Sequence, residues 1–559
     1  MPASPESVLE RAALDPNAPA AGTALSDRVR SFLAVPGRRL DLLCATLAIC
    51  YALPALFYPH GNDQSLHWYV GQGILRGELP FVGAISAKPV GIFVVHALSS
   101  LLFGSGQAAI RIADVLTLCG CAWLVAVISR PSGQGRSAGE IGLAAIVLFG
   151  LYYTYFDYWD QGHPELWEGT FSLAGTVIAS GDGRLRRRAF WVGLFSTIAL
   201  MFKHTAVVLT LPLAGYLLGH ALGRRSLAAA WRSLLRDVVL PYALGTVIVL
   251  AACVLPYAVT GQLKPMWEVL FTAVLRYAEK APGPDGIPDW FCLEYGGSAL
   301  IATGVALISG RVVSRRRGRE DDVQRGLLLL GMTVAAIASV VVQYRFYTYH
   351  FVVVAPWLAA SMVWGLRMIW PQDRERPIAL AVALVAVAFA AGPWWRSCRD
   401  YTYHQHFASL ASYLAGKTSR WEYLEPFTGQ NRLDHYRVLE SIGKQIKQRA
   451  QPGDTLCVRG FAPPIYQVSG LRCPSRHVVQ ARVTLPGWDE EYAALVVRNP
   501  PRFIVTFRDR PDDISKLRLR GYRPLPSPKW FMVMELPPRV PKRHAHVRPG
   551  PVRRVRRRR

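Results

Sequence analysis

The sequence predicts an integral membrane protein, with about eleven α-helical spans followed by a small C-terminal α/β domain. Its 559 residues are 51% hydrophobic and only 18% charged, whereas about a quarter of the residues of a soluble domain are charged. Apolar runs such as Asp41–Tyr58 and Ile378–Trp395 have the length of a bilayer span. Charged residues cluster between such runs. This pattern excludes a soluble multidomain protein, a disordered chain, a fibrous repeat and a disulfide-dense secreted scaffold.

The net charge of +26, from 64 Lys and Arg against 38 Asp and Glu, is compatible in principle with nucleic-acid binding. Arg clusters between apolar runs instead indicate membrane topology, so we expect no nucleic-acid partner.

The N-terminal segment, residues 1–39, is rich in Ala, Pro and Ser and becomes basic toward its end. It contains no apolar core before Leu40, so a cleavable signal peptide is not expected. The first span should act as an uncleaved anchor, with the preceding Arg residues in the cytoplasm.

A transmembrane domain is predicted over residues 40–395. Its spans are expected at 41–58, 108–129, 140–157, 165–180, 189–202, 204–222, 237–259, 297–310, 326–342, 350–366 and 378–395.

The apolar run Val90–Gly104 decides the topology, because counting it as a span inverts every later loop. If it does not span, the loops predicted to be cytoplasmic contain 19 Arg and the opposite loops contain 7 Lys or Arg over more residues. The positive-inside rule selects this arrangement. We therefore expect Val90–Gly104 to be a juxtamembrane or re-entrant helix on the outer face.

Residues 396–540 contain no span-length apolar run. Alternating strand and helix patterns predict a small periplasmic α/β domain with strands at 455–461, 502–508 and 530–536 and helices at 464–470, 490–497 and 512–520. Cys457 and Cys473 lie in this domain and are candidates for a disulfide, although Cys292 and Cys398 share the outer side. The tail, residues 541–559, holds nine Lys or Arg and no acid and is expected to be disordered.

Ionisable residues gather on the predicted outer face. The candidates are Asp63 and Lys88 in the first outer loop, Arg111 at the start of the second span, Asp157, Asp160 and Glu165 around the second outer loop, Lys203 and His204 at the break between two spans, and Arg345 and His350 around the fifth outer loop. Lys and Arg suit an anionic group, and a neighbouring carboxylate suits proton transfer. A sugar joined through phosphate to a lipid meets both requirements.

Each residue also has a simpler interpretation. Asp63 is compatible with a solvated loop acid, and Glu165 with an acid at a helix N-terminus. Lys88 and Arg111 are compatible with interfacial anchors, and His350 with a satisfied polar residue at a helix start. The concentration of these residues on one face is the stronger signal.

The sequence resembles the type-C, multi-span glycosyltransferases that use lipid-phosphate sugars, and in particular a bacterial branch related to protein mannosyltransferases and aminoarabinose transferases. The motifs that carry the resemblance are Asp63 after the first span, Leu75-Arg76-Gly77-Glu78-Leu79-Pro80-Phe81, Lys88-Pro89-x-Gly91, Leu102-Phe103-Gly104-Ser105, Ala109-Ile110-Arg111, Asp157 to Glu165, Tyr347-Thr348-Tyr349-His350-Phe351, Val458 to Tyr466, and Asn499 to Ile504. The likeness extends loosely over most of residues 40–540.

The resemblance implies an inverting reaction in which Asp63 is the general base that activates the acceptor hydroxyl. It implies that Glu165 is the second acid, with Asp157 and Asp160 as alternatives. Lys88, Arg111, Lys203 and Arg345 are candidates for phosphate binding, and His204 and His350 lie beside them. It also implies that Val90–Gly104 is a juxtamembrane helix of the family.

Two residues depart from the family pattern. Many members have two acids after the first span, whereas Asp63 is followed by Gln64, and the Lys-Pro-Pro turn of relatives is Lys88-Pro89-Val90 here. A divalent cation is compatible with the class, but no cofactor is required by the sequence.

The predicted function is inverting transfer of a sugar from a polyprenyl-phosphate carrier to a glycan, lipid or protein acceptor on the outer face of a bacterial inner membrane. A transporter or flippase of lipid-linked sugars is the first alternative, although the charges lie at one face rather than along a midplane path. A non-catalytic polysaccharide assembly protein is the second.

Overall fold

The computed structural model describes residues 38–133, 135, 139–222, 227–279, 298–343, 345–369, 403–427, 435–479, 485–508, 521–528 and 530–537. The chain forms two compact units, Met1–Arg437 and Val438–Arg559. The predicted span at 378–395, the predicted helix at 512–520, the N-terminal segment up to residue 37 and the basic tail lie outside the described residues.

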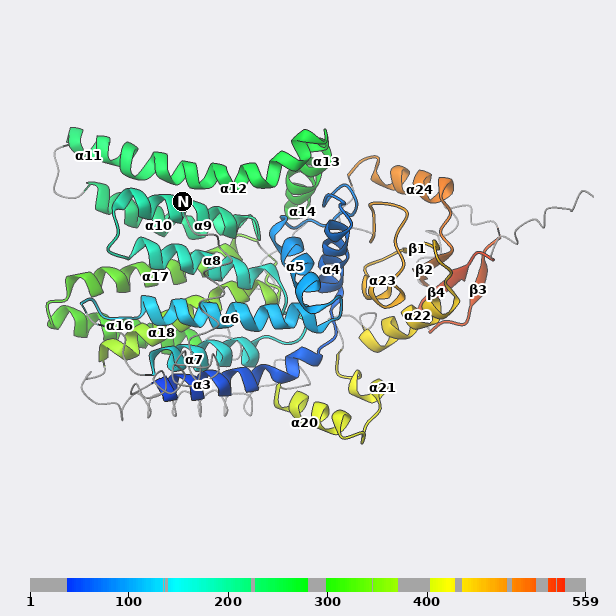
Figure 1. The fold of residues 1–559 in the computed structure, drawn as a ribbon, viewed down its shortest axis with the longest axis horizontal. Coiled ribbons are helices and arrows are strands. Elements are labelled where there is room, and N and C mark those ends of the chain that lie inside the picture. The colour runs from blue at the N-terminus through cyan, green and yellow to red at the C-terminus, as the bar shows by residue number, and fades with distance from the viewer. Residues whose placement is uncertain are drawn as a thin grey trace, which may run out of the picture. The chain divides into compact units, whose positions relative to one another are not determined.

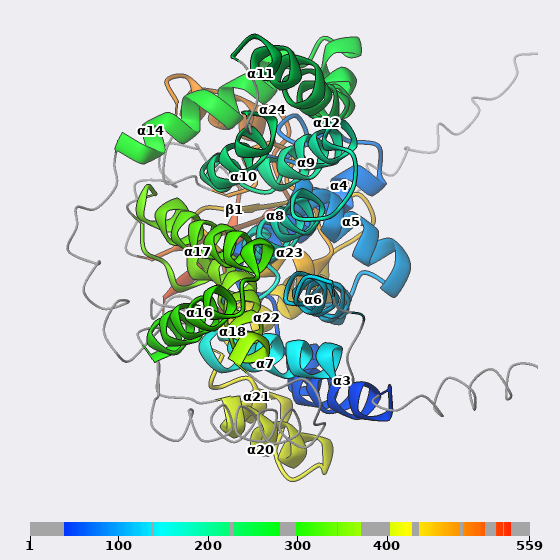
Figure 2. The same cartoon turned by 90° about the vertical axis from the view of Figure 1, so that its left-hand side faces the viewer.

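The first unit is a bundle of α-helices (Figure 1). Its long elements are α3 (Arg38–Ala52) with η1 (Leu53–Phe57), α6 (Ala108–Ile128), α7 (Glu140–Tyr155), α8 (Pro164–Ala179), α9 (Leu185–Leu200), α10 (Ala206–Leu222), α11 (Leu227–Ser233) with η2 (Leu234–Val239) and α12 (Leu240–Val259), α16 (Ser298–Arg316), α17 (Glu320–Val341), and η6 (Thr348–Val354) with α18 (Ala355–Ile369). A view along the bundle shows them arranged from α3 and α7 on one side to α11 and α12 on the other (Figure 2).

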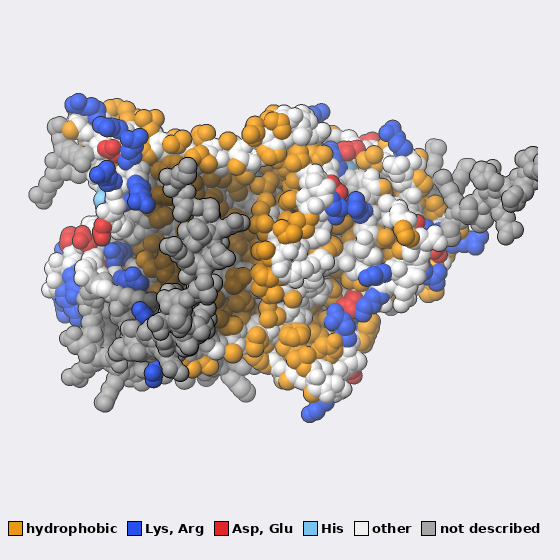
Figure 3. All heavy atoms as spheres, viewed as in Figure 1, with side chains coloured by type: hydrophobic (Ala, Val, Ile, Leu, Met, Phe, Trp, Pro, Cys, Tyr) orange, Lys and Arg blue, Asp and Glu red, His pale blue; other side chains and the backbone are white. Residues whose placement is uncertain are grey.

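Each predicted span before residue 370 coincides with one of these helices. Among the described residues, the helices long and apolar enough to cross a membrane are Arg38–Phe57, Ala108–Ile128, Ala229–Val259, Glu320–Val341 and Thr348–Met368. Hydrophobic side chains cover much of the described part of the bundle on the face seen in Figure 3. Leu240, Leu244 and Val247 of α12 are more than half exposed. Such an apolar surface requires lipid around it, which confirms an integral membrane protein.

Helices α9 and α12 approach closely because glycines face each other across their contact. A Cβ on Gly193 would lie 2.2 Å from the carbonyl oxygen of Tyr242, and one on Gly245 would lie 2.3 Å from that of Phe190. Small residues allow this close backbone packing between membrane helices, where the hydrophobic effect contributes little.

A buried acid organises the Arg-rich end of the bundle. Glu140, at the start of α7, is paired with Arg130 at 2.5 Å and with Arg367 of α18 at 3.2 Å. This pairing offsets the cost of burying the Glu140 carboxylate. It also joins two of the loops predicted to be cytoplasmic.

Two shorter helices, α4 (Asn62–Leu75) and α5 (Gly91–Phe103), lie across the other end of the bundle instead of running along it (Figure 1). The segment α13 (Leu263–Trp267), η3 (Glu268–Ala273) and α14 (Val274–Glu279) lies at the same end, where the sequence predicts only a loop. Pro265 and the charges of Lys264 and Glu268 interrupt the apolar pattern that would have indicated a helix.

Helices α20 (Tyr403–Leu414) and α21 (Arg420–Tyr423) belong to the first unit and were not predicted. Tyr403 of α20 stacks edge-on against Tyr51 of α3, with ring centroids 4.9 Å apart, and donates a hydrogen bond to its carbonyl oxygen at 2.5 Å. Tyr423 donates to the carbonyl of Phe57 at 3.3 Å. These contacts dock residues 403–427 on the first helix of the bundle.

The second unit is built on a four-stranded sheet of order β1-β2-β4-β3. Strand β1 (Leu456–Val458) runs parallel to β2 (Phe503–Phe507), and β4 (Phe531–Glu535) is antiparallel to β2 and to β3 (Arg523–Leu525). Helices α22 (Tyr436–Arg449), α23 (Pro464–Ser469) and α24 (Trp488–Arg498) complete the described elements. Strands β1, β2 and β4 and helix α23 lie within their predicted ranges, and α24 overlaps its predicted range, whereas α22 and β3 were not predicted.

Candidate functional site

A buried ion pair between α8 and the break before α10 forms the centre of the candidate site. Lys203 Nζ lies 2.5 Å from Glu165 Oε1, and the two side chains are 9% and 0% exposed. Pro164 at the first position of α8 presets the helix start, which places Glu165 in the first turn. Burial lowers the pKa of Lys203, and the Glu165 carboxylate opposes that shift.

Three segments far apart in the sequence meet beside this pair. His163 of the second outer loop stacks on Tyr349 of η6, with ring centroids 4.2 Å apart and an interplanar angle of 23°. Lys88 of the first outer loop places its Nζ 5.4 Å from the Tyr349 ring centroid. His350 is buried, with its ring 4.5 Å from that of Tyr349.

His163 lies within electrostatic range of charges on several of these segments. Burial lowers the pKa of His163 to about 4, so its ring is neutral at pH 7; the carboxylates of Asp63 and Glu165 act to raise it, and Lys88 and Lys203 act to lower it. The site therefore combines acids and bases around a neutral, stacked imidazole.

Asp63 lies in the first turn of α4 and is half-buried. Its neighbours Asn62 and Gln64 are fully buried. Arg345, in the fifth predicted outer loop, is also half-buried. Its charge acts on the nearby His350 ring. It precedes Phe346, whose φ of 38° is a backbone conformation rarely adopted by a bulky residue.

Gln64 explains the first departure from the family pattern. Its amide nitrogen donates to the carbonyl oxygens of Trp159 at 2.8 Å and Gln161 at 2.7 Å, with that of Tyr158 at 3.2 Å. This amide ties α4, which carries Asp63, to the second outer loop. A carboxylate has no proton to donate and cannot replace it.

The Gln64→Glu variant is therefore expected to lose stability and activity together. A carboxylate at this position faces two close carbonyl oxygens in the interior, and such unpaired burial costs about 1–3 kcal/mol or more. Thermal unfolding of the detergent-solubilised protein measures the loss. The exposed control Glu425→Gln should leave the unfolding temperature unchanged; a Gln64→Glu variant as stable as the parent would contradict the tether.

Arg111 lies in the interior rather than at the surface of the site. It is 1% exposed and donates to the carbonyl oxygens of Pro59 at 3.0 Å and Tyr158 at 3.1 Å. These bonds join the first and second outer loops. We therefore leave Arg111 out of the proposed phosphate site.

The remaining predicted residues lie in the loops around the centre. Asp160 is buried and accepts a hydrogen bond from the backbone of Asp157 at 3.1 Å, while Asp157 lies 3.6 Å from His406 of α20. His204 is half-buried, with its ring 6.3 Å from that of Phe271. The two acids hold the second outer loop in shape.

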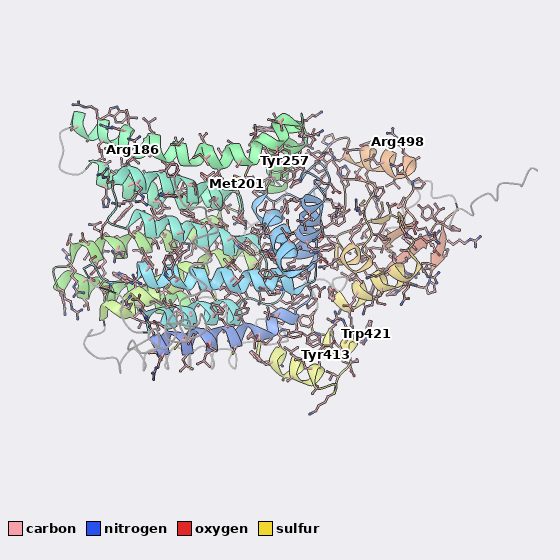
Figure 4. The ribbon with its side chains drawn as sticks, in the orientation of Figure 1. Arg186, Met201, Tyr257, Tyr413, Trp421 and Arg498 are labelled. Carbon is pink, nitrogen blue, oxygen red and sulfur yellow. The ribbon has the colours of Figure 1, made fainter. Side chains whose placement is uncertain are left out.

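Glycine at position 91 allows the first outer loop to dock on the bundle. The Gly91 amide donates to the Met201 carbonyl oxygen at 2.8 Å, and a Cβ there would lie 2.7 Å from the same oxygen. Tyr257 of α12 donates to the carbonyl of Pro80 at 3.2 Å. Figure 4 shows Met201 and Tyr257 on the part of the bundle that faces α4 and α5, with Arg186 at the opposite end. These contacts position Lys88 near Lys203.

A cluster of buried histidines in α4, α5 and the loops beside them was not predicted from the sequence. The ring of His67 lies 5.7 Å from that of His96 and 5.9 Å from that of His163, and His60 lies 6.1 Å from His96. Burial lowers the pKa of all four, to about 3 for His96. The positions of His60, His67 and His96 in or near the outer segments were visible in the sequence, but their burial was not.

These histidines should make the fold sensitive to acid. Below their unfolded pKa of about 6.5, the unfolded chain binds protons that the folded chain excludes, so stability falls by about 1.4 kcal/mol per pH unit for each histidine until its lower folded pKa is reached. Thermal unfolding between about pH 7 and pH 5 should show this slope. The His96→Asn variant should reduce this slope by the contribution of one histidine, and the exposed His220→Gln variant should leave it unchanged; equal slopes in all three proteins would contradict the assignment.

Among the described residues, no group of three or more His, Cys, Asp or Glu is arranged to hold a metal ion.

Comparisons with known proteins give a partial family match and a shared fold. Residues 87–259 match the family model described as dolichyl-phosphate-mannose-protein mannosyltransferase, and this region includes Lys88, Glu165 and Lys203. The family resemblance predicted from the sequence is confirmed over these residues. That family comprises membrane glycosyltransferases that use lipid-phosphate donors.

Among solved structures, the chain is similar to ArnT from Cupriavidus metallidurans. In the apo state the TM-score is 0.54 at 12% identity, and in the structure bound to undecaprenyl phosphate it is 0.51 at 14% identity. Both alignments cover 88% of this chain and 97% of ArnT. At these identities the likeness establishes a shared multi-span fold. No curated protein matches the chain in sequence.

Proposed function

We propose that the chain is an inverting glycosyltransferase, which moves a sugar from a polyprenyl-phosphate carrier to an acceptor on the outer face of a bacterial inner membrane. The observation that carries the proposal is the convergence of half-buried Asp63 and Lys88 around the His163–Tyr349 stack, with the charge of half-buried Arg345 acting on the adjacent His350 ring. The family match and the shared fold with ArnT support it.

The donor phosphate is assigned to Lys88 and Arg345. Lys203 is less suited, because its charge is already balanced by Glu165 at 2.5 Å. Lys88 and Arg345 retain partial exposure, which a ligand-binding cation requires, and Arg offers a fork of donors that matches a phosphate. The lipid tail would lie along the apolar helices, where each buried CH₂ contributes about 0.8 kcal/mol.

Asp63 is assigned as the general base. Its carboxylate takes the proton of the acceptor hydroxyl, and the oxygen forms a bond to the anomeric carbon of the sugar. The bond from that carbon to the phosphate oxygen breaks on the opposite side, and polyprenyl phosphate leaves with the electron pair. Lys88 and Arg345 stabilise the charge that develops on the leaving phosphate. Glu165 acts as a positioning residue that holds Lys203 beside the site.

A direct test is turnover of labelled donors by the purified protein in liposomes. A panel of polyprenyl-phosphate sugars is supplied with a membrane extract as the source of acceptor, and release of the free carrier phosphate is measured. The proposal expects one donor to be consumed. Movement of a donor across the bilayer without loss of its sugar would instead establish a flippase.

The assigned phosphate ligands give a second expected result. Lys88→Ala and Arg345→Ala should each raise the KM for the donor by about 10- to 100-fold, because a charge-assisted hydrogen bond contributes about 1.5–3 kcal/mol. Arg345→Lys should recover part of the loss. The control is Lys264→Ala, which removes a cation that is 86% exposed and lies in the predicted outer loop 260–296; an equal change in KM for the control would contradict a specific phosphate site.

A further inference from the structure

Two cysteines of the second unit lie against each other in its core. Cys457 on β1 is fully buried, and Cys473 follows α23 and is partly buried. Their Sγ atoms are 3.8 Å apart. Both pack in the cluster formed with Tyr492, Val496 and Ile504, between the sheet and α24.

The backbone fixes this juxtaposition. Thr455 and Arg472 form a parallel bridge beside β1, and the Leu456 amide donates to the Arg472 carbonyl at 2.9 Å. The Tyr466 hydroxyl accepts from the Val458 amide and donates to the Val478 carbonyl, both at 2.9 Å. The segment that carries Cys473 is thus held against β1 on both sides of the thiol.

We propose that Cys457 and Cys473 form a disulfide bond in the mature protein, made by thiol–disulfide exchange with an oxidised dithiol protein of the outer compartment. The proposal rests on the outer-face location included in the proposed function. It assigns a covalent modification to the second unit that sugar transfer does not itself require.

The surroundings of the two sulfur atoms assign the order of events. Burial raises the pKa of Cys473, but hydrogen bonds from the Cys457 thiol and the Ser475 amide outweigh it and lower the pKa overall. The contact with Cys473 and burial raise the pKa of Cys457. Cys473 is also the more exposed of the two thiols, which favours it as the first nucleophile.

The exchange balances in two steps. The Cys473 thiolate attacks the disulfide of the oxidant, forms a mixed disulfide and releases one oxidant thiolate. The Cys457 thiolate then attacks Cys473 Sγ and releases the second. The two cysteine protons end on the two thiols of the reduced oxidant, and the two electrons lost by the cysteines reduce its disulfide.

The bond would close a short loop that contains α23. The two cysteines are 16 positions apart. Cross-links of this kind restrict the unfolded chain, and they are common in small domains of oxidising compartments. The other described cysteines, Cys44, Cys50, Cys119, Cys121 and Cys253, belong to the first unit.

Differential alkylation of the full-length protein tests the proposal. Membranes are dissolved in denaturant with one alkylating reagent, which blocks every free thiol, and are then reduced and treated with a second reagent of different mass. Peptide mass spectrometry is expected to find the second label on Cys457 and Cys473 and the first label on Cys121. In the Cys457→Ser and Cys473→Ser variants, the remaining cysteine has no disulfide partner and should carry the first label.

Thermal unfolding gives an independent reading. A reductant is expected to lower the unfolding temperature of the second unit by on the order of 10 °C, and to leave the Cys457→Ser/Cys473→Ser variant unchanged. The first label on both cysteines of the native protein, or a cross-link from either of them to Cys292 or Cys398, would overturn the proposal. Sugar transfer is measured separately on the same samples, so a failure of the disulfide is distinct from a failure of the proposed function.

Discussion

Replacement of Asp63 with Asn is expected to reduce sugar transfer by about 10²–10⁴-fold, the usual contribution of a positioned general base. The amide preserves the shape of the side chain but cannot accept the proton of the acceptor hydroxyl. Since Lys88 and Arg345 remain, the KM for the donor should change little. Initial rates at saturating donor, with purified protein in liposomes, measure the effect on kcat.

The matched control for this change is Asp182→Asn, which alters an exposed acid in the turn between α8 and α9, among the loops predicted to be cytoplasmic. It should retain full activity. Normal transfer by the Asp63→Asn variant, with normal insertion into the membrane, would contradict this role. Asp63 would then be a solvated loop acid that takes no part in the reaction.

Replacement of Lys203 with Met is expected to give the largest loss of stability. It leaves the Glu165 carboxylate, which is fully buried, without its partner at 2.5 Å. Breaking one half of a buried pair costs about 3–5 kcal/mol, because the remaining charge is neither solvated nor compensated. Thermal or denaturant unfolding of the solubilised protein should show this loss.

The double variant Lys203→Met/Glu165→Gln separates the ion pair from a direct contact with the donor. Removing both charges should recover much of the stability. The Lys264–Glu268 pair, whose charged atoms are 3.9 Å apart and whose lysine is exposed, gives the control, since Lys264→Met should cost at most about 1 kcal/mol. If Lys203→Met keeps its stability but raises the KM for the donor, Lys203 is a phosphate ligand and not the partner that neutralises Glu165.

The bundle was predictable because a membrane leaves few choices. Runs such as 108–129 and 237–259 must form helices to satisfy their backbone groups in lipid, and composition alone reveals them. Helices α6 and α12 occupy these ranges. The concentration of Asp63, Lys88 and Lys203 near one another was also predictable, because alternate loops of a bundle share one face.

The rotation of individual side chains was not predictable. Arg111 at the start of a span is equally suited to reach a headgroup or to turn inward, and only its bonds to Pro59 and Tyr158 show the second. The family pattern shows only that Gln64 replaces an acid. The carbonyl groups that its side chain binds lie almost a hundred residues away in the chain, so the sequence did not reveal them. His163 is polar in the sequence, and its stacking on Tyr349 depends on a segment almost two hundred residues later.

The second unit was partly predictable for a similar reason. Strands β2 and β4 have apolar runs that a sheet core requires, and both lie within their predicted ranges. The short edge strand β3 contains Arg523 and Pro524 and has no such pattern. Its pairing with β4 arises from the fold of the whole unit and not from local preference.

The anomeric configuration of the product tests the central claim most directly. A donor of defined configuration, labelled at the anomeric carbon, is turned over by the purified protein, and the configuration of the new glycosidic bond is determined by nuclear magnetic resonance. Displacement of the phosphate by a hydroxyl that Asp63 has deprotonated predicts a product of inverted configuration. A product that retains the configuration of the donor would contradict this account.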